Sequence, residues 1–149
     1  MDDLNYTELS TEIDRQLKTH QYIILATCAN NNVTARAMAH INDGVTVMFS
    51  TNRNSKKVEQ MKQNPNIALA IEGIKIEAAA EIFGQPKSHS LFTAEYVKKF
   101  PQYGTMYLET PDDLLIIARP QKISLYKYLG KPWYEVLDVE NNRAYRVEL

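Results

Sequence analysis

Short β-rich runs that alternate with turn residues are the feature that most limits what this chain can fold into. Residues 22–29, YIILATCA, are followed by three asparagines, and residues 33–41, VTARAMAHI, are followed by Asn42-Asp43-Gly44. Asp-Gly favours a tight hairpin because both residues tolerate a positive φ. Residues 45–50, VTVMFS, would then return as a third strand. The pattern predicts an antiparallel meander.

The rest of the chain continues this pattern and adds a few helices. We expect a hairpin around Gly73, strands at residues 112–120 and 121–130, and weaker strands at 133–139 and 143–149. Apolar spacing and end signals predict helices over residues 6–20, from about Ser55, and over 88–100. Roughly six or more strands at hairpin spacing predict a mainly β fold, a small closed barrel with short flanking helices. The length of 149 residues predicts one domain, residues 1–149.

Composition excludes several classes of function. The chain has 17 basic and 18 acidic residues and a net charge of -1, so any anion site must be local. The basic residues lack the aromatic interleaving of a nucleic-acid surface, and the scattered histidines predict no metal site. No apolar run approaches the roughly 18 residues of a membrane span. The polar N-terminus and the single cysteine, Cys28, predict a cytoplasmic setting without disulfides.

A basic turn lies within residues 49–57, FSTNRNSKK. Lys56 and Lys57 would occupy the first helical positions, beside the positive end of the helix dipole, which is unfavourable unless an anion lies over the turn. A phosphate cradle is one interpretation. The alternative is a solvated turn in which Ser55 caps the helix and Glu59 pairs with Lys56. The cradle would also draw on three hydroxyl donors, Ser50, Thr51 and Ser55.

A further cation, Arg36, belongs to the second predicted strand. Alternation puts Arg36 on the same strand face as Thr34, Met38 and His40. Through the hairpin at residues 42–44, this face could approach the basic turn, and Arg36 would supply a bidentate fork to a phosphate. An exposed cross-strand charge is the other interpretation.

These residues resemble the FMN-binding split-barrel superfamily, specifically the proteins related to pyridoxamine 5'-phosphate oxidase in its general-stress-protein-like branch. The resemblance rests on Arg36-Ala-Met-Ala-His, on Thr51-Asn52-x-x-Ser55-Lys56-Lys57 and on Asn64-Pro65. It implies a six-stranded antiparallel split β-barrel with short flanking helices, a homodimer, and FMN bound at the subunit interface.

The resemblance also implies a set of cofactor-binding residues. Those matching the surroundings of the FMN phosphate are Arg36, Ser55, Lys56 and Lys57. Those matching the surroundings of the flavin ring are Met38, Ala39, His40, Ser50 and Thr51. Several aromatic residues could line a pocket over the flavin or a dimer interface, namely Tyr96, Phe100, Tyr103, Tyr107 and Trp133.

Two departures separate this chain from family members that oxidise pyridoxamine phosphate. Those carry a C-terminal Arg-x-His pair, which residues 141–149, NNRAYRVEL, lack, and a lysine where this chain has Ile41. A second anionic substrate would lack its cations. We therefore predict an FMN-dependent oxidoreductase that uses a nicotinamide-type donor and another small-molecule substrate, with catalytic residues unassigned. The alternatives are a non-catalytic flavin-binding redox or stress module, and a haem- or deazaflavin-binding relative.

Overall fold

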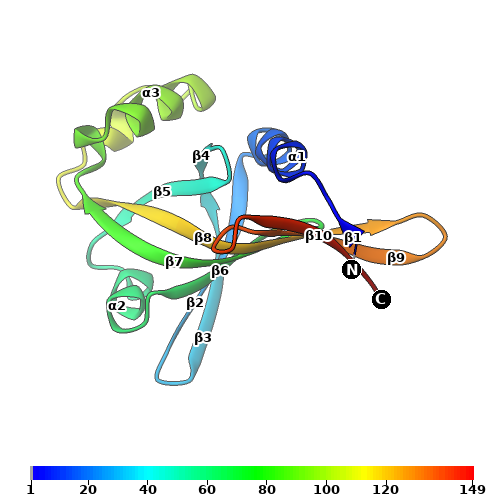
Figure 1. Ribbon diagram of the computed structural model, residues 1–149. Helices are drawn as coiled ribbons and strands as arrows, with labels where there is room; N and C mark the ends of the chain where they lie inside the picture. Colours follow the sequence, from blue (N-terminus) through cyan, green and yellow to red (C-terminus); the bar gives the residue numbers. More distant parts are fainter. Residues whose placement is uncertain (1) are drawn as a thin grey trace.

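Strands dominate the computed structural model, which describes residues 2–149, and three α-helices flank them (Figure 1). The strands are β1 (Asp2–Asp3), β2 (Tyr22–Ala29), β3 (Asn32–Ala39), β4 (Ile41–Asp43), β5 (Thr46–Asn52), β6 (Asn66–Ile71), β7 (Ile74–Gly84), β8 (Asp113–Tyr128), β9 (Pro132–Asp138) and β10 (Arg143–Glu148). The helices are α1 (Tyr6–Lys18), α2 (Lys56–Gln63) and α3 (Ser90–Lys99), with short 3-10 turns at Pro86–Ser88 and Met106–Leu108.

The strands form one antiparallel sheet in the order β1-β10-β9-β8-β7-β6-β2-β3, and β5 joins it by pairing with both β4 and β8. The predicted mainly β class and antiparallel hairpins are therefore confirmed. The six-stranded barrel is not confirmed, because the sheet has ten strands in residues 2–149. β3 and β5 come near each other, but no ladder between them closes the sheet within the described residues.

Turn chemistry explains the hairpins. Asn30 and Asn31, between β2 and β3, have φ angles of 51° and 63°, and Gly44, between β4 and β5, has φ of 60°. Asparagine and glycine adopt this left-handed region most readily. Glu72 also lies there, at φ 47°, in the turn before Gly73. Each of these turns falls where the sequence predicts one.

Strand β8 differs from the prediction of two strands at residues 112–130. It runs unbroken for 16 residues and pairs with β5 and β7 near its start and with β7 and β9 near its end. Pro120 lies within it, opposite Ala78, where the register with β7 shifts. An irregularity of this kind accommodates a proline that cannot donate to the ladder. The strand therefore continues through a residue that usually ends one.

Two apolar clusters hold the helices against the sheet. α1 and α2 pack on the larger cluster, through residues such as Ile13 and Val58, while α3 packs on a smaller cluster that contains Phe92. Strand β5 separates the clusters, because Phe49 faces the larger and Met48 the smaller. No helix within residues 2–149 is long and apolar enough to cross a membrane.

Candidate functional site

The start of α2 carries the basic turn. Ser55 is the N-cap residue, and its Oγ accepts a hydrogen bond from the Val58 N–H at 3.4 Å. Lys56 is exposed and Lys57 is half-buried. Burial lowers the pKa of Lys57, and the nearby charge of Arg36 lowers it further. The two cations that the sequence places 21 positions apart therefore lie close enough to repel each other.

Arg36 is half-buried and held in place by hydrogen bonds to β2 and β3. Its guanidinium donates to the Thr27 hydroxyl at 3.0 Å, the Thr34 hydroxyl at 2.5 Å and the Leu25 carbonyl at 3.2 Å. Burial lowers the pKa of Arg36. Its partners are neutral acceptors, so they fix the side chain without neutralising its charge.

Gln60 links this arginine to α2. Its Oε1 accepts hydrogen bonds from the hydroxyls of Thr27, at 2.6 Å, and Thr34, at 2.8 Å, and its Nε2 donates to the Asn32 carbonyl at 3.2 Å. Gln60 is buried and lies one helical turn after Lys57. Sequence reasoning missed it, because a glutamine amid charged helical residues resembles a surface residue.

No carboxylate pairs with Arg36 or Lys57 among residues 2–149, and Lys56 has no ion pair with Glu59 there. Arg53 differs, since its Nε lies 4.0 Å from a carboxylate oxygen of Asp112. The first N–H groups of a helix also lack partners within the helix. Two adjacent cations beside such a helix start can bind a doubly charged anion such as a phosphate group.

A cavity of about 290 Å³ lies beside β3 and β5. It contains three of the residues predicted to surround a flavin ring, Met38, Ala39 and Ser50. The Ser50 hydroxyl donates to an Asp113 carboxylate oxygen at 3.2 Å. Thr51 follows in the ladder, buried and opposite Leu114. The structure therefore brings these strand-end residues together, and adds Asp113, which no sequence signal marked.

Tyrosines make up the other wall of this cavity. Tyr96, Tyr103 and Tyr107 line it, as the sequence suggested, and Tyr22 joins them from β2. Burial and the neighbouring phenols raise the pKa of Tyr96. Two of the predicted aromatic residues lie elsewhere: Phe100 is buried in the smaller apolar cluster, and Trp133 belongs to β9.

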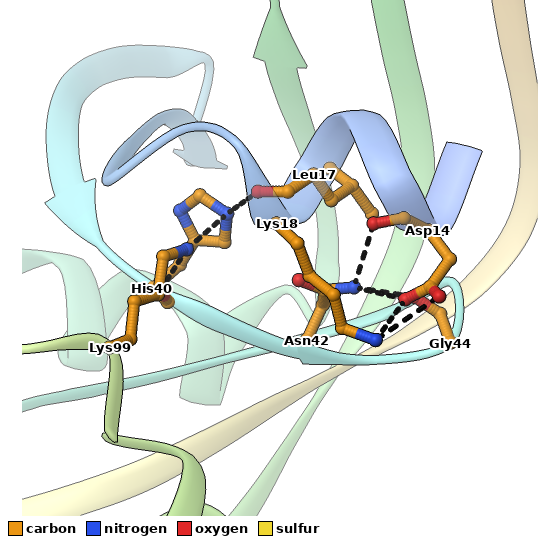
Figure 2. Close-up of polar contacts among 7 residues, drawn as sticks. All are labelled: Asp14, Leu17, Lys18, His40, Asn42, Gly44 and Lys99. Atoms are coloured by element: carbon orange, nitrogen blue, oxygen red, sulfur yellow. Dashed lines mark hydrogen bonds and ion pairs between the residues drawn. The ribbon is translucent and has the colours of Figure 1, made fainter. Parts of the chain in front are cut away.

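His40 does not line this cavity with Met38 and Ala39. Its ring is 1% exposed and lies at the end of α1, with Nε2 at 3.2 Å from the Leu17 carbonyl (Figure 2). Burial and the charge of Lys99 lower its pKa to about 4. These surroundings give no support to a place beside a cofactor ring. His40 directly follows the last residue of β3, Ala39, and its place beside a flavin ring stays a prediction.

Comparison with protein families decides the relationship. The family model for pyridoxamine 5'-phosphate oxidase matches residues 9–126, which is most of the chain. The chain belongs to the pyridoxamine 5'-phosphate oxidase family. The matched region includes both Arg36 and the basic turn, so the predicted relationship is confirmed. No curated protein matches the chain.

Solved structures share the fold of this family member. General Stress Protein 26 from Bacillus anthracis str. Sterne is 20% identical, with a TM-score of 0.63 and coverage of 95% of this chain and 99% of the other. ChuZ from Campylobacter jejuni is 16% identical, with a TM-score of 0.73. The similarity covers 95% of this chain but only 63% of ChuZ. An FMN binding protein from Nostoc punctiforme PCC 73102, described as related to pyridoxamine 5'-phosphate oxidase, is 15% identical, with a TM-score of 0.59 and coverage of 96% and 94%.

Proposed function

We propose that this protein binds FMN and acts as an FMN-dependent oxidoreductase on a small molecule. The observation that carries the proposal is the neighbouring pair Arg36 and Lys57, half-buried and without a carboxylate partner among residues 2–149. A dianionic phosphate would offset their mutual repulsion. The similarity in fold to the FMN binding protein from Nostoc punctiforme supports the choice of cofactor.

The residues present fit FMN. Arg36 and Lys57 would hold the phosphate, and exposed Lys56 would add to the positive potential. The Ser55 hydroxyl already accepts a bond as the helix cap, so its role would be to fix the start of α2. A solvated turn would leave its cations mobile, whereas three acceptors hold the Arg36 guanidinium in one position.

The ring would lie in or beside the 290 Å³ cavity, near Met38, Ala39 and Ser50, with Thr51 next along β5. Apolar and hydroxyl groups there would pack on the ring and bond its polar edge. When bound, FMN would supply hydride transfer between a nicotinamide-type donor and the substrate. The protein's part is to orient the two molecules and exclude water.

Pyridoxamine phosphate is not the substrate that we propose. Asp113 is the charged residue of this cavity, and neither lysine, arginine nor histidine lines it among the described residues. A second phosphate would therefore meet a carboxylate and no cation. Ile41, at the position of the family lysine, is buried.

We also propose a homodimer that uses the outer face of β2, β3 and β6. Ile24 is 45% and Val33 is 70% exposed on this face. Ala35 pairs with Ala26 across the β2–β3 ladder, and side chains this small allow a second copy to approach closely. An exposed sheet face without charged side chains is typical of an interface.

A flavin-binding redox or stress module without turnover is the second candidate. It needs the same cradle, and the fold similarity to General Stress Protein 26 favours it. The absorption spectrum of the purified protein tests the cofactor class, because flavin, deazaflavin and haem absorb differently. FMN should bind the flavin-free protein and lose fluorescence; the absence of binding contradicts the proposal. Oxidation of reduced nicotinamide with a panel of acceptors then separates the enzyme from the module.

A further inference from the structure

A larger cavity, of about 450 Å³, lies between α1, β4 and α3. Its volume is in the range of small-molecule sites. None of its lining residues belongs to the proposed flavin site. The polar residues that matter for its chemistry are Lys18, Asn42, Asp43, Glu95, Lys98 and Lys99.

Among residues 2–149, two buried side-chain atoms lack hydrogen-bond partners, His40 Nδ1 and Asn42 Oδ1. Asn42 lines the cavity and His40 does not. Asn42 is 4% exposed, and its amide group donates to Asp14 Oδ1 and to the Gly44 carbonyl, both at 2.8 Å (Figure 2). Those two bonds fix the amide and leave its oxygen as a free acceptor. Unpartnered buried polar atoms are uncommon in native proteins and call for a functional or solvent explanation.

The unpartnered atom of His40, like that of Asn42, is a hydrogen-bond acceptor. The Leu17 carbonyl, 3.2 Å from His40 Nε2, can only accept and favours the proton on that nitrogen, whereas the Lys99 ammonium, 3.4 Å from it, favours the other tautomer. The shorter contact selects the tautomer with the proton on Nε2. His40 Nδ1 is then also an acceptor without a donor. The lowered pKa of His40, about 4, keeps the ring neutral. Both orphan atoms are closed to solvent, and Asn42 is the one of the two residues that lines the cavity.

Lysines make one side of the cavity positive. Lys99 Nζ donates to the His40 carbonyl at 2.8 Å, and burial lowers the Lys99 pKa to about 8. Neither Lys98 nor Lys99 pairs with a carboxylate among residues 2–149, whereas Lys18 lies 2.9 Å from an Asp14 oxygen. A half-buried ammonium group without an anion is a site for one.

Carboxylates line the same cavity, and they too are unpaired. Asp43 and Glu95 belong to no ion pair within the described part of the chain. Unpaired charges of both signs in one cavity suit a ligand that carries both. A simple anion would leave the carboxylates unpaired, and a simple amine would leave the lysines unpaired. Ile41 and Leu91 add apolar wall.

We propose that this cavity binds a small zwitterion of the size of an amino acid, with its carboxylate at Lys98 and Lys99 and its ammonium group toward Glu95 and Asp43. The proposal is independent of the flavin site. The two cavities share no lining residue, so each site can be tested without the other's ligand.

The test compares three matched probes on the full chain by calorimetry. L-leucine carries both charges, 4-methylpentanoate lacks the ammonium group, and 3-methylbutylamine lacks the carboxylate. Leucine should bind roughly tenfold or more tightly than either fragment, since each charge-assisted contact is worth about that factor. NMR should show leucine shifting the side-chain amide signals of Asn42. Equal binding of all three probes, or the absence of leucine binding, overturns the proposal.

Two variants assign the charges. Lys99→Met should reduce the affinity for leucine to that for 3-methylbutylamine. Glu95→Gln should reduce the affinity for leucine to that for 4-methylpentanoate. The same variant should bind 4-methylpentanoate more tightly than the wild type does. Lys87→Met, at an exposed lysine of the 3-10 turn, is the control and should leave all three affinities unchanged. If Lys99→Met does not fold, Glu95→Gln decides, because Glu95 is not buried. Unchanged leucine affinity in Glu95→Gln contradicts the proposal.

Discussion

The side-chain oxygen of Gln60 on α2 accepts a 2.6 Å hydrogen bond from the hydroxyl of Thr27 on β2. The same hydroxyl accepts a bond from Arg36 at 3.0 Å. A chain of neutral groups therefore ties the helix that carries Lys57 to the strand that carries Arg36. This connection therefore helps to hold the two cations near each other.

Replacing Gln60 tests whether this connection sets the phosphate site, and the test rests on the proposed binding of FMN. Gln60→Glu keeps the shape but places a carboxylate beside Arg36, which would compete with a phosphate. We expect FMN affinity to fall roughly tenfold, about 1.4 kcal/mol, and riboflavin affinity to fall much less. Fluorescence titration with both ligands measures the difference. Gln63→Glu is the control, at an exposed position of the same helix.

Removing the cations themselves should separate FMN affinity from riboflavin affinity more strongly than Gln60→Glu does. Arg36→Ala and Lys57→Ala should each weaken FMN by roughly tenfold to a hundredfold, because a charged hydrogen bond contributes about 1.5–3 kcal/mol. Riboflavin lacks the phosphate and should lose little. Arg119→Ala, which removes an exposed arginine paired with Glu81, should affect neither ligand. If FMN and riboflavin lose affinity equally, these cations do not hold the phosphate.

His40 should make stability depend on pH in acid. Its pKa is about 4 in the folded chain and 6.5 ordinarily, so the unfolded chain binds more protons between these values. The free energy of unfolding should therefore fall as pH decreases from 6.5 to 4, by roughly 3 kcal/mol from this group. Urea unfolding across this range measures it. His40→Gln should flatten the profile, and a profile as steep as that of the wild type would contradict this assignment.

Charge on the outer sheet face should prevent the proposed dimer. Ala35→Arg places a cation opposite Ala26 in the middle of the face, where a second copy would have to desolvate it. Sedimentation should show dimers for the wild type and monomers for the variant. Asn31→Arg, at the tip of the same hairpin, should remain dimeric. A monomeric wild type contradicts the proposed assembly.

Local signals account for most of what the sequence predicts correctly. Asn30, Asn31 and Gly44 carry their turn chemistry with them, and the spacing of Leu9, Ile13 and Leu17 marks the buried face of α1. These features depend on neighbours in the chain, so pattern reasoning finds them. The meeting of Arg36 and Lys57 followed from strand alternation and the resemblance together.

Features set by distant contacts could not be predicted in this way. Pro120 usually ends a strand, and only the register shift opposite Ala78 shows why it does not. Gln60 becomes recognisable only when Thr27 and Thr34 are seen beside it. The burial of His40 depends on α1, because its ring lies against the Leu17 carbonyl, 23 positions earlier in the chain.

Strand β8 has a consequence for how the chain opens. Leu115, Ile116 and Ile117 have ladder partners on both sides, in β5 and in β7. A strand with neighbours on both sides is shielded from solvent at both edges, so the amides of these residues should be among the last to exchange. The start of β8 pairs with β5, beside the 290 Å³ cavity, and its end pairs with β9. Loss of β8 from either part would therefore spread to the other, which makes the strand a determinant of cooperative unfolding.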